Sequence, residues 1–120
     1  MALMKKIGWA LKGVKETFRT ELNFKLEVFS GFFLAGFVYL AWPLSFAELA
    51  ALLMAYTSAL VLEMVNTSIE AALGRLHPEK HDLIGKAKDA AAGAVFLSVV
   101  LTFIIAGLIL LNRFGVLVLR

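Results

Sequence analysis

The sequence predicts an all-α membrane protein with an N-terminal amphipathic surface helix and three transmembrane helices. Hydrophobic residues make up 61% of its 120 residues, whereas a soluble domain is usually about half apolar. Two stretches, 28–47 and 90–112, contain no charged residue, and each can cross a hydrocarbon core about 30 Å thick. A third apolar run, 49–62, leads directly into a polar segment. A soluble shell for such helices would need a longer chain.

The surface helix is expected at about residues 4–20. Its apolar side chains recur at intervals of three or four residues and so share one face: Ile7, Leu11, Val14 and Phe18. Basic residues occupy much of the rest, which is typical of a helix lying in the headgroup layer. A soluble helix packed on a partner is the alternative. We expect a break at residues 20–23, with Asn23 as a candidate N-cap of the first span.

The spans are expected at about residues 24–46, 48–73 and 86–112. Trp42 and Pro43 mark the turn between the first and the second span. The second span joins an apolar half to a polar continuation, and Gly74 is its expected stop. Together with the surface helix, the spans form a single domain over residues 1–120.

Lys and Arg predict the orientation of the spans. Ten of them precede the first span or lie between the second and third: Lys5, Lys6, Lys12, Lys15, Arg19, Lys25, Arg75, Lys80, Lys86 and Lys88. The connection 42–48 has none. By the positive-inside rule, the N-terminus and the second loop are cytoplasmic, and the C-terminus, with Arg113 and Arg120, is outside. The basic residues are thus explained by membrane topology, and the sequence has no stacking or groove-reading motif. Both observations argue against nucleic-acid binding.

A polar stripe in the second span carries the functional signal. At 100° per residue, Glu63, Asn66, Thr67 and Glu70 fall on one side of a helix. A charged side chain at the centre of a span costs roughly 2.5–3.5 kcal/mol on insertion scales, so these acids need a compensating partner. Pairing with basic residues at the interface is the structural alternative. We favour a functional site, because ionisable groups inside spans usually serve one.

The chemistry expected from these residues is phosphoryl transfer to a lipid. Glu21, at the entrance of the first span, and Glu70 are hard oxygen ligands of the kind that Mg²⁺ prefers. Lys88, at the start of the third span, would neutralise phosphate charge nearby. Glu63, the deepest acid, is placed to accept the proton of a lipid hydroxyl. Phosphoryl transfer requires little beyond such positioning, a metal and cationic donors.

The loop before the third span has a histidine pair. His77 and His81 are four residues apart, but Pro78 between them and the absence of cysteine argue against zinc. A solvated loop or a nucleotide contact is the expected role. The chain also lacks the GxxxxGK[ST] loop and the kinase-type glycine-rich loop, which excludes the common nucleotide-binding folds.

The chain resembles the small bacterial membrane lipid kinases, which comprise diacylglycerol kinase and undecaprenol kinase. The resemblance runs from about Trp9 to the end of the third span. It is carried by Thr20-Glu21-x-Asn23, by Glu63-x-x-Asn66-Thr67-x-Ile69-Glu70-Ala71, and by His81, Lys88 and Asp89. It implies a homotrimer in the bacterial inner membrane that shares active sites between neighbouring protomers and uses ATP with a divalent metal.

The resemblance also implies residue roles. Glu63 is the implied general base, and Glu21 and Glu70 are the implied metal ligands, beside the nucleotide. Asn66 and Lys88 are implied to contact phosphate or to order the site. The implied nucleotide contacts are Trp9, Glu79, His81 and Asp89.

We favour undecaprenol as the acceptor, giving undecaprenyl phosphate, because residues 87–95 resemble that branch. Diacylglycerol, giving phosphatidic acid, is the alternative; Leu11 stands where its branch usually has tryptophan, and Lys25 where it has arginine. A different class of function is a proton- or cation-conducting oligomer with Glu63 and Glu70 as the relay. A scaffolding membrane subunit is the third class.

Overall fold

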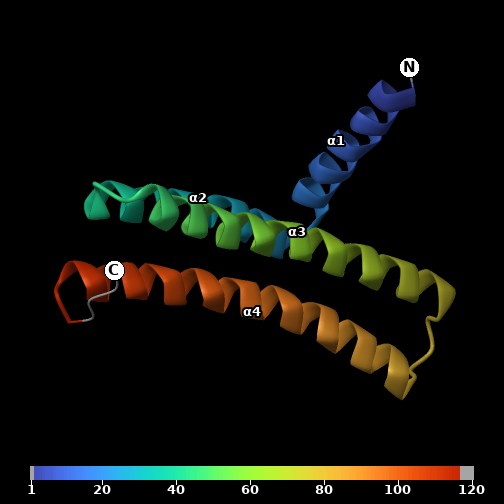
Figure 1. The fold of residues 1–120 in the computed structure, drawn as a ribbon. Helices are drawn as coiled ribbons and strands as arrows, with labels where there is room; N and C mark the ends of the chain where they lie inside the picture. Colours follow the sequence, from blue (N-terminus) through green and yellow to red (C-terminus); the bar gives the residue numbers. More distant parts are fainter. Residues whose placement is uncertain (1, 117–120) are drawn as a thin grey trace.

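Residues 2–116 are described by a computed structural model, and they form four helices (Figure 1). α1 (Ala2–Thr20) projects at an angle from the others, and it buries none of its residues. α2 (Leu22–Ala41), α3 (Phe46–Leu76) and α4 (Asp82–Arg113) are each long and apolar enough to cross a membrane. The predicted fold class is therefore confirmed. Arg120, one of the two arginines used to place the C-terminus, lies outside the described residues.

The three long helices run up, down and up. α3 and α4 lie side by side as an antiparallel pair, and α2 lies against α3 (Figure 1). The buried side chains of α3 recur every three or four residues and therefore form one stripe. That stripe begins with Leu52, Ala55 and Ala59 and ends with Glu63 and Asn66. The surface that packs α3 into the bundle thus becomes polar toward its C-terminal half.

The break between α1 and α2 lies at Glu21. Its backbone is extended, with φ −103° and ψ 112°, and its side chain makes no capping hydrogen bond. The expectation that Asn23 caps the first span is wrong, because Asn23 lies inside α2. α2 ends at Ala41 rather than near residue 46. Its end precedes Pro43, which disfavours helical geometry in the residue before it.

α3 is longer than expected at its C-terminal end. It passes through Gly74 and ends at Leu76, so Gly74 is not the stop. His77 follows with φ −144° and ψ 72°. Because His77 precedes Pro78, its backbone is held outside the helical region. Proline, and not glycine, therefore ends this helix.

Two side chains cap the starts of α3 and α4. The Ser45 hydroxyl accepts a hydrogen bond from the Glu48 backbone N–H at 3.1 Å. The His81 Nδ1 accepts one from the Leu83 backbone N–H, also at 3.1 Å. α4 consequently begins at Asp82, before the expected start near residue 86.

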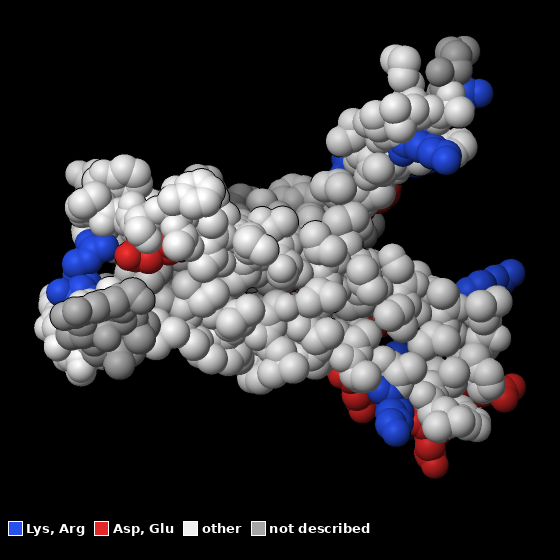
Figure 2. Space-filling view, viewed as in Figure 1, with Lys and Arg blue, Asp and Glu red and all other residues white. Residues whose placement is uncertain are grey.

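Arg113 closes the end of the bundle where α2 turns into α3. Its guanidinium donates to the carbonyl oxygens of Ala41 and of Pro43, the latter at 2.9 Å. It also lies 3.6 Å from the Glu48 carboxylate. On the face in Figure 2, charged side chains lie on α1 and at the two ends of the bundle, with uncharged surface between them. This pattern matches helices that cross a membrane.

Candidate active site

The polar stripe of α3 is buried where the sequence predicted a functional site. Glu63 is only 5% exposed and Asn66 is 7% exposed. Thr67 is half-buried and Glu70 is exposed, so the stripe opens toward the C-terminal end of α3. A carboxylate at this depth requires polar partners or a ligand.

Four carboxylates gather around this stripe. Glu63 interacts electrostatically with Glu70 on its own helix and with Glu21 at the break between α1 and α2. Glu27 on α2 also interacts with Glu63. The structure therefore brings together the three predicted acids and adds a fourth. Glu27 was not among the predicted site residues, although an acid directly before the uncharged stretch 28–47 was an available signal.

Three polar atoms in this region have no hydrogen-bond partner among the described residues. They are buried oxygens: Oε2 of Glu27, Oδ1 of Asn66 and Oγ1 of Thr67. Unpaired polar atoms are costly in hydrocarbon, because no water is there to satisfy them. The stripe thus has the character of a site that receives a polar ligand.

The donor set fits magnesium held together with a nucleotide. Within residues 2–116, no three Asp, Glu or His side chains converge as a complete metal cage. Mg²⁺ is usually bound by only one or two carboxylates, with waters and substrate phosphates supplying the other oxygens. Glu21 and Glu70 can supply those carboxylates, and the unpartnered Asn66 oxygen lies on the same stripe. The arrangement is therefore suited to a metal that arrives with phosphate.

A hollow lies at the connection between α3 and α4. It measures about 790 Å³, within the usual range of small-molecule sites. Its lining includes four residues that were predicted to bind nucleotide: Glu79, His81, Lys88 and Asp89. These four residues, which lie between positions 79 and 89 of the sequence, thus line the same hollow.

His81 has a structural role that the sequence did not reveal. Its Nδ1 accepts the hydrogen bond from the Leu83 backbone N–H that caps α4. The ring centroids of His77 and His81 lie 5.8 Å apart in an edge-to-face arrangement. In the described part of the chain, this pair belongs to no three-residue metal group.

Trp9 is not brought to this hollow. It lies on the projecting helix α1, is 68% exposed and does not line the loop between α3 and α4. Lys88 is half-buried and lines the hollow from the first turns of α4. A single chain therefore assembles the acidic stripe of α3 and the hollow at the α3–α4 loop, here called the loop hollow. Trp9 remains apart from both.

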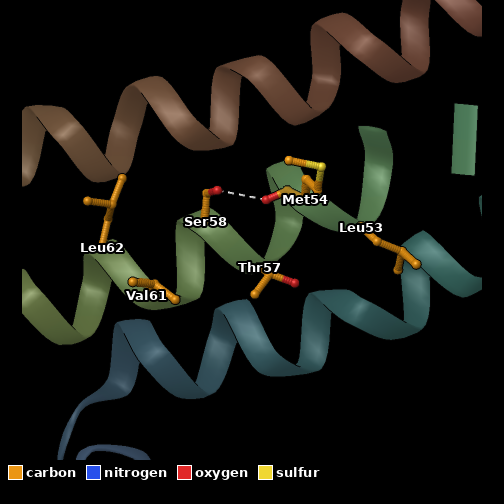
Figure 3. Close-up of a pocket in the computed structure, with 6 residues that line it drawn as sticks. All are labelled: Leu53, Met54, Thr57, Ser58, Val61 and Leu62. Atoms are coloured by element: carbon orange, nitrogen blue, oxygen red, sulfur yellow. Dashed lines mark hydrogen bonds between the residues drawn. The ribbon is translucent and has the colours of Figure 1, made fainter. Parts of the chain in front are cut away.

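A separate, apolar hollow of about 550 Å³ follows the membrane-spanning part of α3. All of its lining side chains come from α3, between α2 and α4 in Figure 3: Leu53, Met54, Thr57, Ser58, Val61 and Leu62. None of them is ionisable, and the Ser58 hydroxyl donates to the Met54 carbonyl of its own helix at 2.7 Å. Glu63 is not among the lining residues, and no pattern in the sequence had indicated this hollow.

Comparison with known proteins decides the family. Residues 8–110 match the model of the prokaryotic diacylglycerol kinase family. The chain belongs to this family. It is 34% identical over 112 residues to a diacylglycerol kinase of Synechocystis sp., covering 91% of this chain but only 62% of that protein. It is 31% identical over 110 residues to the diacylglycerol kinase of Haemophilus influenzae, covering 90% and 91% of the two chains.

A relative named for another acceptor is also similar. The chain is 35% identical over 104 residues to the undecaprenol kinase of Bacillus subtilis, covering 85% of this chain and 82% of that one. The resemblance inferred from the segment 63–71 is therefore confirmed. As a member of the prokaryotic diacylglycerol kinase family with three helices suited to span a bilayer, the chain is a lipid kinase of a bacterial membrane.

Proposed function

We propose that this lipid kinase transfers the γ-phosphoryl group of ATP to the hydroxyl of undecaprenol, giving undecaprenyl phosphate. The similarity to an undecaprenol kinase supports this acceptor, as do Leu11 and Lys25 at positions where the diacylglycerol branch has other residues. Diacylglycerol, giving phosphatidic acid, is the second candidate, because other relatives carry that name.

The burial of Glu63 carries the proposal. At 5% exposure, this carboxylate lies on a helix that is long enough to cross the bilayer, at a depth that a lipid hydroxyl can reach. Its role is to accept the hydroxyl proton as the phosphoryl group is transferred. Asn66, one turn further along and also buried, orders the reacting groups beside it.

The nucleotide is expected to bind at the same end of the bundle. Glu21 and Glu70 would hold Mg²⁺, which when bound neutralises charge on the phosphates. Lys88 supplies a cation to the phosphates from α4. Glu79, His81 and Asp89 would contact the nucleotide in the hollow that they line, with Trp9 as an aromatic neighbour.

The active unit proposed is a homotrimer whose protomers share active sites. Trp9 and the loop hollow are separate within one chain, so a neighbouring protomer can bring them together. The apolar hollow on α3 favours helix association, because Thr57 and Ser58 are small side chains of the kind that line helix contacts in membranes (Figure 3).

The orientation proposed places the N-terminus and the α3–α4 loop in the cytoplasm, where ATP is available. The basic residues of α1 and of that loop support this orientation through the positive-inside rule. The C-terminal end of α4 then lies outside.

The test is a phosphorylation assay on the purified protein in bicelles. Undecaprenol and diacylglycerol are each supplied with ATP, with and without Mg²⁺. We expect the monophosphate of undecaprenol to form faster than phosphatidic acid, and only with Mg²⁺. Phosphorylation of neither lipid, together with ion flux through liposomes lacking nucleotide, would instead support a conducting oligomer.

A further inference from the structure

We propose that Tyr56 is a positioning residue: with Gly31, its hydroxyl locks α2 against α3 and so holds the Glu27 carboxyl beside Glu63. The inference rests on the proposed role of Glu63 in lipid phosphorylation. It concerns residues on α2 and α3 that the proposed mechanism does not otherwise use.

The Tyr56 hydroxyl joins the two helices. It donates toward the backbone carbonyl oxygen of Glu27 at 2.8 Å and toward that of Val28 at 3.0 Å. A phenol has one proton, so the two carbonyls share it in a three-centre hydrogen bond. No water competes for these carbonyls in a hydrocarbon environment, so the hydroxyl fixes how far α2 can slide along α3.

Gly31 makes this contact possible. A Cβ atom at residue 31 would lie 2.6 Å from the Tyr56 hydroxyl oxygen and 3.2 Å from the ring carbon that bears it. The backbone of α2 can approach the phenol only because this position has no side chain. Gly36, on the same helix, has nothing within 4 Å of its corresponding position. It therefore provides a matched control.

The contact of Tyr56 with Gly31 and the two carbonyls, here called the clamp, lies next to the acids. Tyr56 and Glu63 are seven residues apart on α3, which is about two helical turns and therefore the same side of the helix. The Glu27 charge interacts with both Tyr56 and Glu63, and its Oε2 is buried without a partner. The carbonyl that Tyr56 holds thus belongs to the residue whose carboxyl interacts electrostatically with Glu63. A shift of α2 would move one carboxyl relative to the other.

Kinetics of the full-length protein in bicelles test the clamp. Tyr56→Phe keeps the ring but loses both hydrogen bonds, and we expect kcat to fall about tenfold, since small misplacements of reacting groups are costly. The KM for MgATP should stay unchanged, because the loop hollow lies elsewhere. Tyr39→Phe, at an α2 residue that is 81% exposed, is the control and should keep the wild-type kcat. An unchanged kcat in Tyr56→Phe would overturn the proposal.

A double substitution tests whether the two residues act together. Gly31→Ala should lower kcat about as much as Tyr56→Phe does, and Gly36→Ala should not. Adding Gly31→Ala to Tyr56→Phe should cost little more, because the nearest atom, the hydroxyl oxygen, is already gone. Losses that simply multiply in the double variant would show that the two residues act separately.

Infrared spectroscopy of the carboxyl groups gives a readout that does not depend on activity. The bands of Glu27 and Glu63 are identified as those lost in Glu27→Gln and in Glu63→Gln. Tyr56→Phe should shift both bands, whereas Tyr39→Phe should shift neither. Unshifted bands would overturn the clamp even in an active kinase. Shifted bands in a protein that phosphorylates no lipid would refute the proposed function and leave the clamp intact.

Discussion

The hydroxyl of Tyr56 lies 2.8 Å from the backbone carbonyl oxygen of Glu27, so α2 and α3 are joined two turns away from the buried Glu63. This contact joins an apolar region of α2 and α3, which takes no part in the proposed reaction, to the region that carries Glu63. It also shows how a chain with a small core fixes the position of its acids.

Glu63→Gln should reduce kcat by at least about 100-fold, because an amide cannot accept the proton of the lipid hydroxyl. Assembly in bicelles, measured by size-exclusion chromatography with light scattering, should not change. Glu16→Gln is the matched control, since Glu16 forms its ion pair with Arg19 on the surface of α1. Wild-type turnover in Glu63→Gln would show that another group is the base.

Glu70→Gln should raise the Mg²⁺ concentration needed for half-maximal activity by roughly tenfold, equivalent to about 1.4 kcal/mol of binding free energy. The reason is the loss of one of two carboxylates available to the metal. Titration calorimetry of magnesium nucleotide provides the second measurement. Glu48→Gln, at the other end of α3, should leave the Mg²⁺ requirement unaltered. An equal Mg²⁺ requirement in the wild type, Glu70→Gln and Glu48→Gln would show that Glu70 does not bind the metal.

His81 can be tested for two roles at once. His81→Ala should lower the free energy of unfolding by about 1 kcal/mol through loss of the α4 cap, whereas His81→Asn should retain most of it because asparagine caps helices well. Both variants should raise the KM for ATP if the ring contacts nucleotide. If His81→Asn has both a normal KM for ATP and a normal free energy of unfolding, the role of His81 is limited to capping α4.

Arg113→Met should destabilise the bundle without slowing the reaction. The guanidinium donates to the carbonyls of Ala41 and Pro43, and losing these bonds should cost about 1–2 kcal/mol. The neighbouring Glu48 is about 22 Å along α3 from Glu63, judged from the rise per residue. Thermal unfolding in detergent and kcat measured well below the midpoint check the two halves of this prediction. A lower kcat under folded conditions would contradict it.

The absence of cysteine allows a direct test of topology. In sealed cells, Ala47→Cys should react with a membrane-impermeant maleimide, because the first turn of α3, next to the α2–α3 turn, is expected outside. Lys80→Cys should react only after the membrane is opened, because the α3–α4 loop is expected in the cytoplasm. The reverse pattern would invert the proposed orientation and remove the loop hollow from the ATP side.

The sequence was sufficient for the fold because hydropathy and length alone identify helices that span a membrane. It also placed Glu63 and Asn66 correctly on one side of α3, because helical periodicity fixes which residues share a face. The helix ends were harder. Gly74 looked like a stop, but the backbone restriction imposed by Pro78 ended the helix, and Asn23 lost the capping position to Glu21.

Contacts between helices could not be predicted. Nothing in the spacing of residues shows that Tyr56 meets the carbonyls of Glu27 and Val28, since those residues are 28 and 29 positions away. Glu27 was therefore overlooked, although its neighbour across the helix contact is Glu63. The capping role of His81 was not predicted for a different reason. Histidine is not among the residues usually expected at helix starts.

The alanines of α3 have a consequence for how this enzyme can diversify. Ala55 and Ala59 lie on the same buried stripe as Glu63 and Asn66, so a bulkier residue there would push the neighbouring helix outward and away from both of these polar side chains. New acceptor preferences must then arise on surfaces that do not bear this packing. The outer face of α2, where Phe33 and Leu40 are exposed, is such a surface, and the chain can vary there while its reactive centre stays constant.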